Sequence, residues 1–405
     1  MSKPRIWVVS ELYYPEETST GYFLTRIAEG LADRFAVHAV CSRPTYSARQ
    51  LQVPWRETRG GVEIHRMRST RFDKDVALGR ALNLATFTLA ASIFCFRHLR
   101  RGDQVLVVTN PPTIPPIAGL IARLKGARAY LLVHDVYPEV LVATGIIGEG
   151  SWISGLLGRL TSMTYRLYDK VVVLGRDMAA VARNRLPDQD ERVTIIANWG
   201  DLDEVRPLDR EENPFVAAHN PDHRTLIQFS GNIGRTHDVE SILAAARNLE
   251  DRADIQFQFV GTGGKAKLLE GTEGDLPNVA YLPRQPRSML GPMLAGADAV
   301  VISFVDRMLG VSVPSRMYNV MAAGTPIIAM AHPDSELAKV VLEEECGWIV
   351  APGDAHGLSA LVRRIATQEG RADASQRGLR GRDAAIRRFS FPIILAQFET
   401  LFSER

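Results

Sequence analysis

The segment that decides how this chain folds reads Gly310-Val311-Ser312-Val313-Pro314-Ser315-Arg316-Met317-Tyr318-Asn319-Val320-Met321-Ala322-Ala323-Gly324-Thr325-Pro326. Its start predicts a loop, and the apolar positions that follow predict a short buried helix. Gly324 and Pro326 predict the end of that helix, and the apolar run Ile327–Met330 predicts a strand. Ser315 and Arg316 stand at the helix start, where free amides, the helix dipole and a guanidinium all favour an anion.

Short apolar runs alternate with amphipathic helical patterns on both sides of this segment. The strands predicted in the second half are Thr225–Phe229, Ile255–Val260, Ala299–Ile302, Ile327–Met330 and Trp348–Val350. Those predicted in the first half are Arg5–Ser10, Val37–Cys41, Val62–Met67, Gln104–Thr109, Ala129–Val133, Lys170–Leu174 and Val193–Ala197. This alternation predicts an α/β protein with doubly wound parallel sheets. The polar stretch 198–223 breaks the pattern and predicts two domains, residues 1–200 and 201–385.

Two glycine-containing turns follow strands of the second half. One spans residues 230–235 and includes Gly231, Gly234 and Arg235, and the other spans residues 260–265 and includes Gly261. Glycine lets backbone amides approach a phosphate closely, and a following helix start favours anions. Each turn alone is explained equally well as a tight connection. Together with the Ser315-Arg316 loop, the first turn would lie at the carboxyl ends of strands in one sheet, facing one diphosphate.

These segments resemble those of retaining, nucleotide-sugar glycosyltransferases of the GT-B fold. The closest resemblance is to the Ser-x-Pro-Ser-Lys/Arg branch of family 4, common in bacterial capsule, colanic acid and O-antigen assembly and including N-acetylfucosaminyl- and fucosyltransferase-like enzymes. Asn198-Trp199 is similar to the segment that ends the first domain in this group, and the resemblance covers essentially the whole chain. It implies two Rossmann-like domains facing across a cleft, with a last helix in residues 386–405 that packs on the first domain. It also implies no metal and no cofactor besides the nucleotide-sugar co-substrate.

The resemblance implies a set of residues that bind the donor. They are Gly21, Gly231, Asn232, Gly234, Arg235, Gly261, Leu282, Arg284, Pro314, Ser315, Arg316 and Asn319.

Two features depart from the family pattern. The family usually places Arg and Lys at the positions of Asn232 and His237, so we expect Arg235 and Arg316 to supply the missing positive charge. Its paired glutamates fall at Val311 and Asn319. An asparagine can still bind ribose hydroxyls, whereas a valine cannot replace a carboxylate.

The first half contains the residues expected on the acceptor side. Glu11 ends the first strand, and residues 15–21 resemble the flexible glycine loop of the family, with Ser19 or Thr20 also able to cap the next helix. His134 and Asp135 end a buried strand, and such groups are suited to orienting or deprotonating a hydroxyl. The acceptor-side prediction is thus Glu11, Thr20, His134 and Asp135, and the catalytic prediction is His134, Asp135 and Arg316. Asp135 as the cap of a helix over residues 136–143 is the alternative.

The composition, 46% apolar and 23% charged, is that of an ordinary globular protein. Three cysteines without metal or disulfide spacing, and a strand that begins soon after Met1, predict a cytoplasmic protein. Residues 1–200 hold 26 Lys and Arg against 18 Asp and Glu, whereas the remainder holds 22 against 28. The basic half is expected to face an anionic partner other than nucleic acid, unless the asymmetry reflects only surface solubility.

The segment Leu82–Arg101 is nearly all apolar up to Phe96 and then basic. It is shorter than the roughly 20 apolar residues that span a bilayer. It predicts either a buried core helix or a helix that lies on a membrane surface with its basic residues at the headgroups. The second interpretation predicts peripheral association with the cytoplasmic membrane. It agrees with the acceptor that the family implies, a sugar on polyprenyl diphosphate.

The family resemblance favours a UDP-linked N-acetylated amino sugar as donor, with GDP-fucose as a close rival. Two other functions stay open. One is a GT-B epimerase such as a UDP-N-acetylglucosamine 2-epimerase, and the other is a non-catalytic subunit that binds a nucleotide sugar. The loss of glutamates at Val311 and Asn319 argues weakly against the first and supports the second. A dehydrogenase is disfavoured because no Gly-x-Gly-x-x-Gly with an acidic partner follows the first strand.

Overall fold

The structure is a computed structural model that describes residues 3–45, 50–72 and 76–404. It divides the chain into two compact units. The N-terminal unit comprises Met1–Val140, Ile147–Ala197 and Ile394–Arg405, and the C-terminal unit comprises Leu141–Ile146 and Asn198–Ile393. The chain therefore passes between the units beside the boundary predicted near residue 200.

An eight-stranded sheet forms the centre of the N-terminal unit, in the order β3-β4-β2-β1-β5-β6-β7-β8. Its strands are β1 (Arg5–Val9), β2 (Ala36–Ser42), β3 (Arg56–Arg59), β4 (Val62–Met67), β5 (Gln104–Val108), β6 (Arg128–Val133), β7 (Lys170–Val173) and β8 (Val193–Ile195). The strands predicted for the first half are all present and parallel, as near-continuous Val, Leu and Ile runs require. The sequence pattern missed β3, an antiparallel edge strand of charged, mostly exposed residues.

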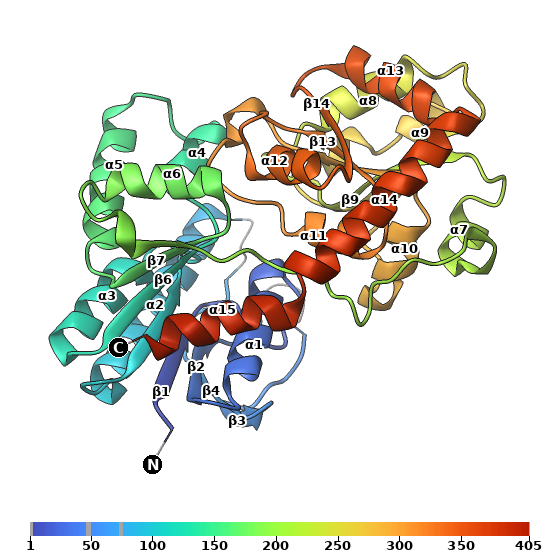
Figure 1. Cartoon of the computed structure of the whole chain (residues 1–405). Coiled ribbons are helices and arrows are strands. Elements are labelled where there is room, and N and C mark those ends of the chain that lie inside the picture. The colour runs from blue at the N-terminus through green and yellow to red at the C-terminus, as the bar shows by residue number, and fades with distance from the viewer. Residues whose placement is uncertain (1–2, 46–49, 73–75, 405) are drawn as a thin grey trace. The chain divides into compact units, whose positions relative to one another are not determined.

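Helices connect these strands (Figure 1). They are α1 (Ser19–Leu31), α2 (Ala77–His98), α3 (Ile114–Lys125), α4 (Glu139–Ala143), α5 (Trp152–Tyr165) and α6 (Arg176–Arg185), with the short 3-10 helix η1 (Asp190–Arg192) and the final helix α15 (Phe391–Ser403). Most of α15 belongs to this unit. The ring of Phe402 packs 6.2 Å from that of Phe35 and 4.7 Å from that of Tyr130. Gln104 Nε2 donates to the Phe402 carbonyl oxygen at 3.0 Å.

Helix α2 contains the apolar segment identified in the sequence. One face, including Phe87, Ala91 and Cys95, is buried, but five large apolar side chains on the helix are at least 41% exposed: Leu78, Leu82, Leu89, Ile93 and Phe96. By length and composition Leu78–His98 could cross a membrane, and a third of it is buried within the protein. The prediction of a buried core helix therefore holds for one face of α2 only, and the other face is exposed.

The C-terminal unit is built on a second sheet, entirely parallel, in the order β11-β10-β9-β12-β13-β14. Its strands are β9 (Thr225–Asn232), β10 (Ile255–Thr262), β11 (Val279–Leu282), β12 (Ala299–Ser303), β13 (Ile327–Met330) and β14 (Gly347–Val350). Its helices are α7 (Pro214–His219), α8 (Val239–Arg247), α9 (Thr272–Asp275), α10 (Leu290–Ala295), α11 (Arg316–Ala322), α12 (Glu336–Glu343), α13 (Ala355–Ile365) and α14 (Gln368–Arg388), with the 3-10 helices η2 (Arg210–Glu212), η3 (Ala266–Leu268), η4 (Arg287–Met289) and η5 (Asp306–Met308).

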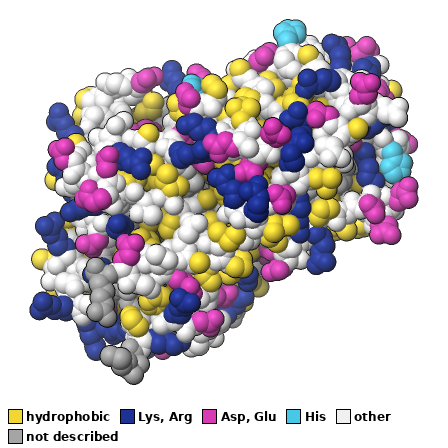
Figure 2. All heavy atoms as spheres, viewed as in Figure 1, with side chains coloured by type: hydrophobic (Ala, Val, Ile, Leu, Met, Phe, Trp, Pro, Cys, Tyr) yellow, Lys and Arg dark blue, Asp and Glu magenta, His cyan; other side chains and the backbone are white. Residues whose placement is uncertain are grey.

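The core of the C-terminal unit lies between this sheet and its helices. It includes Phe229, Phe257 and Phe259 from the strands, and Ile242 and Val362 from α8 and α13. On the outside, side chains of both charges are spread over the face shown in Figure 2, with apolar side chains between them. The predicted helix stop is confirmed, because α11 ends at Ala322 and Gly324 has a φ of 72°.

Candidate functional site

The carboxyl ends of β9 and β10 form a glycine-lined edge of the C-terminal sheet. The strands are parallel, and Gly231 is paired with Gly261. A Cβ at residue 261 would lie 1.9 Å from the carbonyl oxygen of Gly231, and the φ of 142° is disfavoured for other residues. Both observations require glycine at this position. The two predicted glycine turns therefore meet at one edge of the sheet.

Arg316, the first residue of α11, reaches the same edge. Its Nη1 donates to the carbonyl oxygen of Ser230 at 2.6 Å and would lie 3.2 Å from a Cβ on Gly231. Its guanidinium carbon lies 4.8 Å from the ring centre of Phe229. Burial lowers the pKa of Arg316 to about 10, so the side chain stays charged at neutral pH. The structure thus brings Arg316 and the Gly231 turn together.

His237 holds the guanidinium of Arg316 from the other side. Its Nδ1 donates to the carbonyl oxygen of Ser303 at 2.6 Å, so Nε2 carries the lone pair and accepts from Arg316 Nη2 at 2.9 Å. Burial, reinforced by the charge of Arg316, lowers the pKa of His237 to about 3. His237 is therefore a neutral acceptor that orients Arg316. It does not replace the cationic charge that the family usually has at this position.

Asn232 fills the space between the two glycine turns. A Cβ at Gly234 would lie 2.7 Å from its Nδ2, and a Cβ at Gly263 would lie 2.8 Å from its Oδ1. Arg235 is exposed and forms no hydrogen bond or ion pair with the described residues. Of the two arginines expected to supply charge here, only Arg316 is fixed by contacts within the described part of the chain.

The predicted donor-binding residues Leu282 and Arg284 lie at and after the end of β11, which pairs with β10 at the edge of the same sheet. Leu282 pairs with Val260, and the hydroxyl of Tyr281 donates to the carbonyl oxygen of Gly261 at 3.1 Å. Leu282 is half-buried and Arg284 is exposed. This segment is thus attached to the glycine-lined edge through Tyr281, a contact that the sequence pattern did not reveal.

The residues of the loop before α11 differ in how far they are buried. Pro314 is buried, Ser315 is half-buried, and Ser315 makes no side-chain cap to α11. The guanidinium of Arg316 carries a full positive charge, whereas the N-terminus of a helix is equivalent to about half a charge. Val311 is 1% exposed, so the first glutamate position of the family is part of the apolar core here.

Asn319 stands at the second glutamate position. Its Oδ1 accepts a hydrogen bond from the backbone N of Asp201 at 2.9 Å, which leaves its Nδ2 as the group that can still donate to a ligand. The carboxylate of Asp201 is paired with Arg287 at 2.7 Å, and Arg287 also pairs with Glu204 at 3.0 Å. The carboxylate of Asp201 is therefore engaged by Arg287.

In the N-terminal unit the predicted glycine loop leads into α1. Thr18 caps this helix, because its Oγ1 accepts from the backbone N of Gly21 at 3.3 Å. The prediction that Ser19 or Thr20 caps it is wrong. A Cβ at Gly21 would lie 2.7 Å from the carbonyl oxygen of Glu16, so the loop folds closely over the helix start.

His134 and Thr20 lie together beyond the sheet of the N-terminal unit. Thr20 Oγ1 is 3.3 Å from His134 Nδ1, and the backbone N of His134 donates to Thr109 Oγ1 at 3.1 Å. Burial lowers the pKa of His134 to about 4, so the ring is neutral at pH 7. Its Nε2 is buried and has no hydrogen-bond partner among the described residues. This nitrogen is the group that the site offers to a ligand.

Two carboxyl groups of this unit titrate near neutral pH. Burial raises the pKa of Asp135 to about 6, and its side chain forms no hydrogen bond with the described residues. Burial raises the pKa of Glu11 to about 7, against the charge of Arg80 and with a smaller contribution from Glu16. Such values suit a general base. Asp135 does not cap a helix, because α4 begins only at Glu139.

Three participants were not singled out from the sequence: His237 as the partner of Arg316, Thr109 as the anchor of His134, and Tyr281 as the link between β10 and β11. Each makes its contact with a segment distant in the chain. For His237 the only sequence signal was its departure from the family's lysine.

Both halves of the chain match known glycosyltransferase families. Residues 224–368 match the family described as "Glycosyl transferases group 1", and residues 20–199 match the "Glycosyl transferase 4-like domain". WbjE of Pseudomonas aeruginosa, named as a glycosyltransferase, is 31% identical over 370 residues, which is 89% of each chain. WcaI of Escherichia coli strain K12, named for colanic acid biosynthesis, is 26% identical over 380 residues, 89% of this chain and 91% of WcaI.

Among solved structures, HepE of Anabaena in complex with UDP and glucose matches with a TM-score of 0.73. Its identity is 13%, and the match covers 98% of this chain and 99% of HepE, which shows a shared fold. The two parallel sheets and their connecting helices agree with the predicted GT-B architecture. The 31% identity over most of the chain, and the two domain matches, show that this chain belongs to the group 1, family-4-like glycosyltransferases of the GT-B fold.

Proposed function

We propose that this enzyme moves a sugar from a nucleoside diphosphate sugar to a sugar on polyprenyl diphosphate, with retention of configuration and without a bound metal. The proposed donor is a UDP-linked N-acetylated amino sugar, and the proposed pathway is cell-surface polysaccharide biosynthesis. WcaI is named for colanic acid biosynthesis, which supports the pathway, and HepE was solved with UDP, which supports the UDP part of the donor. The N-acetylated amino sugar is carried over from the family resemblance. Retention is carried over from the family resemblance.

The observation that carries this proposal is the arrangement of Arg316, His237 and Gly231. His237 and the Ser230 carbonyl fix two nitrogens of the guanidinium, while Arg316 Nε has no partner among the described residues. An oriented cation beside an unobstructed glycine backbone can stabilise the charge that develops on a departing diphosphate. Asn319 Nδ2 and the backbone after β11 would bind the nucleoside part of the donor.

The acceptor hydroxyl would be activated in the N-terminal unit. Asp135 carries a carboxyl group that forms no hydrogen bond with the described residues and is half ionised near pH 6, so it can take up a proton. Neutral His134, held by Thr20 and Thr109, can orient the hydroxyl through its unpartnered Nε2. Glu11, which titrates near pH 7, is the second candidate base of this unit.

A thermal-stability screen tests the donor site. UDP, GDP, ADP and their common sugar derivatives would be added to wild type, Arg316→Ala and the control Arg247→Ala, an exposed arginine in α8. A ligand at a hundredfold excess over Kd stabilises the folded state by about 2.7 kcal/mol. We expect UDP compounds to raise Tm in wild type and in the control but not in Arg316→Ala. No shift with any nucleotide in wild type contradicts the donor assignment.

Transfer assays separate an enzyme from a binding subunit. UDP-N-acetylhexosamines would be incubated with the protein and a polyprenyl diphosphate glycan, and release of UDP and the glycolipid product would be measured. Nucleotide binding without transfer to any acceptor supports a non-catalytic subunit. Inversion at the anomeric carbon of the product, read by NMR, contradicts the retaining mechanism.

We also propose that the N-terminal unit lies on the cytoplasmic membrane, where a polyprenyl-linked acceptor is held. Helix α3 packs against both α2 and α5, and none of the three carries an Asp or Glu. Besides the five exposed apolar side chains of α2, their exposed large apolar residues are Ile117, Leu120, Leu124, Trp152, Ile153, Leu156, Leu160 and Met163. Apolar surface of this extent without carboxylates fits an anionic lipid surface.

Basic residues accompany this apolar surface. Arg97, Arg100 and Arg101 follow or end α2, and Arg123 and Lys125 end α3. A hollow of about 800 Å³ beside α5 is lined by Arg159, Arg166 and Arg185 together with Met163 and Glu139, and the Glu139 carboxylate pairs with Arg185. Each Lys or Arg near an anionic leaflet contributes about 1 kcal/mol to membrane binding. The charge thus complements anionic headgroups, in agreement with the basic first half of the sequence.

Sedimentation with vesicles tests the membrane assignment. We expect binding to phosphatidylglycerol-containing vesicles, weak binding to phosphatidylcholine alone, and release by high salt because the surface charges are screened. The pair Leu124→Gln and Trp152→Ala should weaken binding, whereas Leu342→Gln in α12, an equally exposed leucine of the C-terminal unit, should not. Equal binding by all variants contradicts the assignment to α2, α3 and α5.

A further inference from the structure

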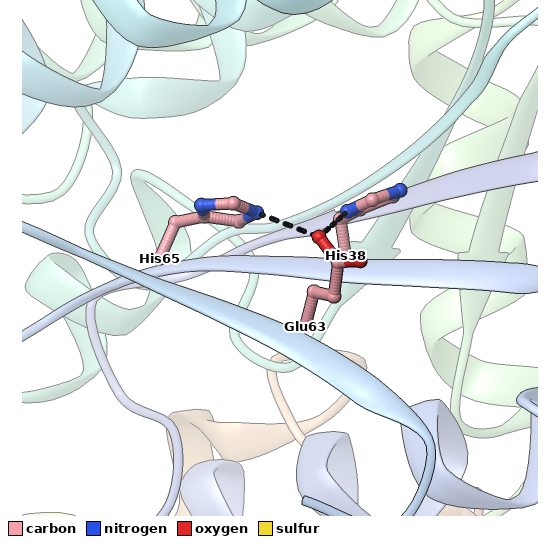
Figure 3. A group of neighbouring side chains, drawn as sticks. All are labelled: His38, Glu63 and His65. Atoms are coloured by element: carbon pink, nitrogen blue, oxygen red, sulfur yellow. Dashed lines mark ion pairs between the residues drawn. The ribbon is translucent and has the colours of Figure 1, made fainter. Parts of the chain in front are cut away.

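Three potential metal ligands lie on one face of two neighbouring strands in the N-terminal unit. Strands β2 and β4 are parallel, and His38 is paired with Glu63. His65 lies two residues further along β4, so its side chain is on the same face as that of Glu63. Figure 3 shows the carboxylate of Glu63 placed between the two imidazole rings.

The distances are close to those of a metal site. Glu63 Oε2 lies 3.3 Å from His38 Nδ1 and 3.8 Å from His65 Nε2, and the three ligand atoms all lie within 4.8 Å of one another. Ligands about 2.0–2.1 Å from a tetrahedral Zn²⁺ are separated by about 3.4 Å. The distance from Glu63 to His38 already matches that spacing, and the other ligand atoms lie within 4.8 Å of one another.

The ring nitrogens of His65 lack hydrogen bonds. Both are buried and have no hydrogen-bond partner among the described residues, while His38 Nδ1 is buried with the Glu63 carboxylate at 3.3 Å as its polar neighbour. Buried polar atoms are nearly always bonded, and an exception calls for a missing partner such as an ion. Two unsatisfied nitrogens on one ring, beside a second imidazole and a carboxylate, therefore point to a ligand that binds imidazole nitrogen.

The surrounding rings fix the two histidines without using their nitrogens. Trp7 stacks on His38 with ring centres 4.3 Å apart, and Phe94 of α2 lies 5.1 Å from the ring of His65. Glu63 is 59% exposed, which leaves a path from solvent to the cluster. The rings are thus oriented in advance, as metal-binding histidines usually are, although here by aromatic contacts.

We propose that His38, Glu63 and His65 bind one Zn²⁺, in a site separate from the proposed glycosyltransferase site. Two imidazoles and one carboxylate form a ligand set that Zn²⁺ accepts, with water in the remaining position. The site lies near the start of β2 and β4, whereas the candidate acceptor-side residues Glu11, His134 and Asp135 follow the carboxyl ends of β1 and β6. Its role is structural: the ion would join β4, which carries the edge strand β3, to β2.

Titration calorimetry on chelator-treated protein without a polyhistidine tag tests this site. We expect one Zn²⁺ per chain for wild type, and loss of this binding in His38→Ala and His65→Ala. His98→Ala is the matched control, because His98 stacks on Phe94 in the same aromatic cluster but is not one of the three ligands. Failure of wild type to bind, or unchanged binding in both ligand variants, overturns the proposal.

Glu63→Gln keeps the test valid if the buried histidine variants do not fold. Glu63 is mostly exposed and its amide replacement has the same shape, so the variant should fold normally while binding Zn²⁺ more weakly. Zinc should raise the Tm of wild type and of His98→Ala, and raise that of Glu63→Gln less. Visible absorption of Co²⁺ in place of Zn²⁺ should show tetrahedral coordination in wild type. An octahedral Co²⁺ spectrum, or an equal Tm shift in Glu63→Gln, contradicts the site. None of these readouts depends on glycosyl transfer.

Discussion

Arg316 is held in place by a neutral histidine. Most of its guanidinium contacts are to neutral acceptors, the Ser230 carbonyl and His237 Nε2, so its charge is not cancelled by a carboxylate. A buried cation without a counter-ion is costly for the folded state. Such a cation can be retained at a site that binds an anion, because the ligand then provides the missing negative charge.

Replacing His237 by Phe should separate orientation from charge. Phenylalanine keeps the stacking on Phe304 but removes the acceptor for Arg316 and the donor to Ser303. We expect the free energy of unfolding to fall by about 1–3 kcal/mol, since buried groups lose their partners. We also expect the KM for the nucleotide sugar to rise. Urea unfolding and steady-state kinetics measure the two effects. An unchanged KM would show that His237 does not position Arg316.

Gly261 should tolerate no side chain. In Gly261→Ala the new methyl would meet the carbonyl oxygen of Gly231, and the positive φ adds strain. We expect a loss of at least about 2 kcal/mol in unfolding free energy, measured by urea denaturation, together with weaker UDP binding. Gly264→Ala is the control, because a Cβ there meets nothing within 4 Å. Equal stability of the two variants would contradict this account of the turn.

Glu11 should make stability depend on pH. Its pKa is raised from 4.5 to about 7 in the folded state, so the folded protein binds the proton more tightly than the unfolded chain does. Stability from this group is therefore lost as the pH rises from about 4.5 to about 7. Glu11→Gln should be more stable than wild type by about 1–3 kcal/mol at pH 8 and little different at pH 4. Glu17→Gln, an exposed residue of the same loop, should show no such pH-dependent gain in urea titrations.

The strands and the glycine turns could be predicted from the sequence, because their signals are local. Runs of Val, Leu and Ile such as Gln104–Val108 and Ile327–Met330 are strands in the structure. The edge strands β3 and β11 could not be predicted in the same way. β3 has no apolar pattern, and the four-residue β11 is mostly half-buried. Their position depends on hydrogen bonds to a neighbouring strand, which one segment of sequence does not encode.

The surroundings of helix α2 could not be predicted from its sequence either. Its composition indicates a low-polarity environment but does not say whether that environment is protein or lipid. The structure shows both a buried and an exposed apolar face.

The proximity of His38 and His65 could not be predicted from local sequence either. These residues lie far apart in the sequence and become neighbours only through the pairing of β2 with β4. Alternation within β4 placed Glu63 and His65 on one face, yet nothing local indicated their partner.

Helix α14 is fitted to the end of α11 by a glycine. A Cβ at residue 378 would lie 1.9 Å from the carbonyl oxygen of Gly324, within the turn that stops α11. Gly→Ala in a helix normally stabilises by about 1 kcal/mol. In Gly378→Ala we expect the opposite sign, a destabilisation of at least about 1 kcal/mol, because α14 must move off the turn. Ser375→Ala at an exposed position of the same helix is the control in urea unfolding. A stabilised Gly378→Ala would show that this contact is easily relieved.

The N-terminal unit is built from both ends of the chain, because the chain returns to it after the C-terminal unit. Residues Ile394–Arg405 complete that unit although they follow the whole of the C-terminal unit. Folding of the N-terminal unit therefore requires a contact between distant parts of the sequence. The sequence resemblance predicted a returning helix but could not name the side chains that anchor it, since these depend on the shape of the surface they meet.

Phe402 anchors α15, and its replacement should destabilise the N-terminal unit alone. It is 2% exposed and packs on Phe35 and Tyr130, so Phe402→Ala should cost about 3–5 kcal/mol. Ile393→Ala, at a 37% exposed position of the same helix, is the control and should cost little. Unfolding would be followed by hydrogen exchange, which resolves the two units. Protection should fall in β1, β5 and β6 while UDP still protects the ends of β9 and β10. Equal loss of protection in both units would show that they unfold as one, and that α15 stabilises the chain as a whole.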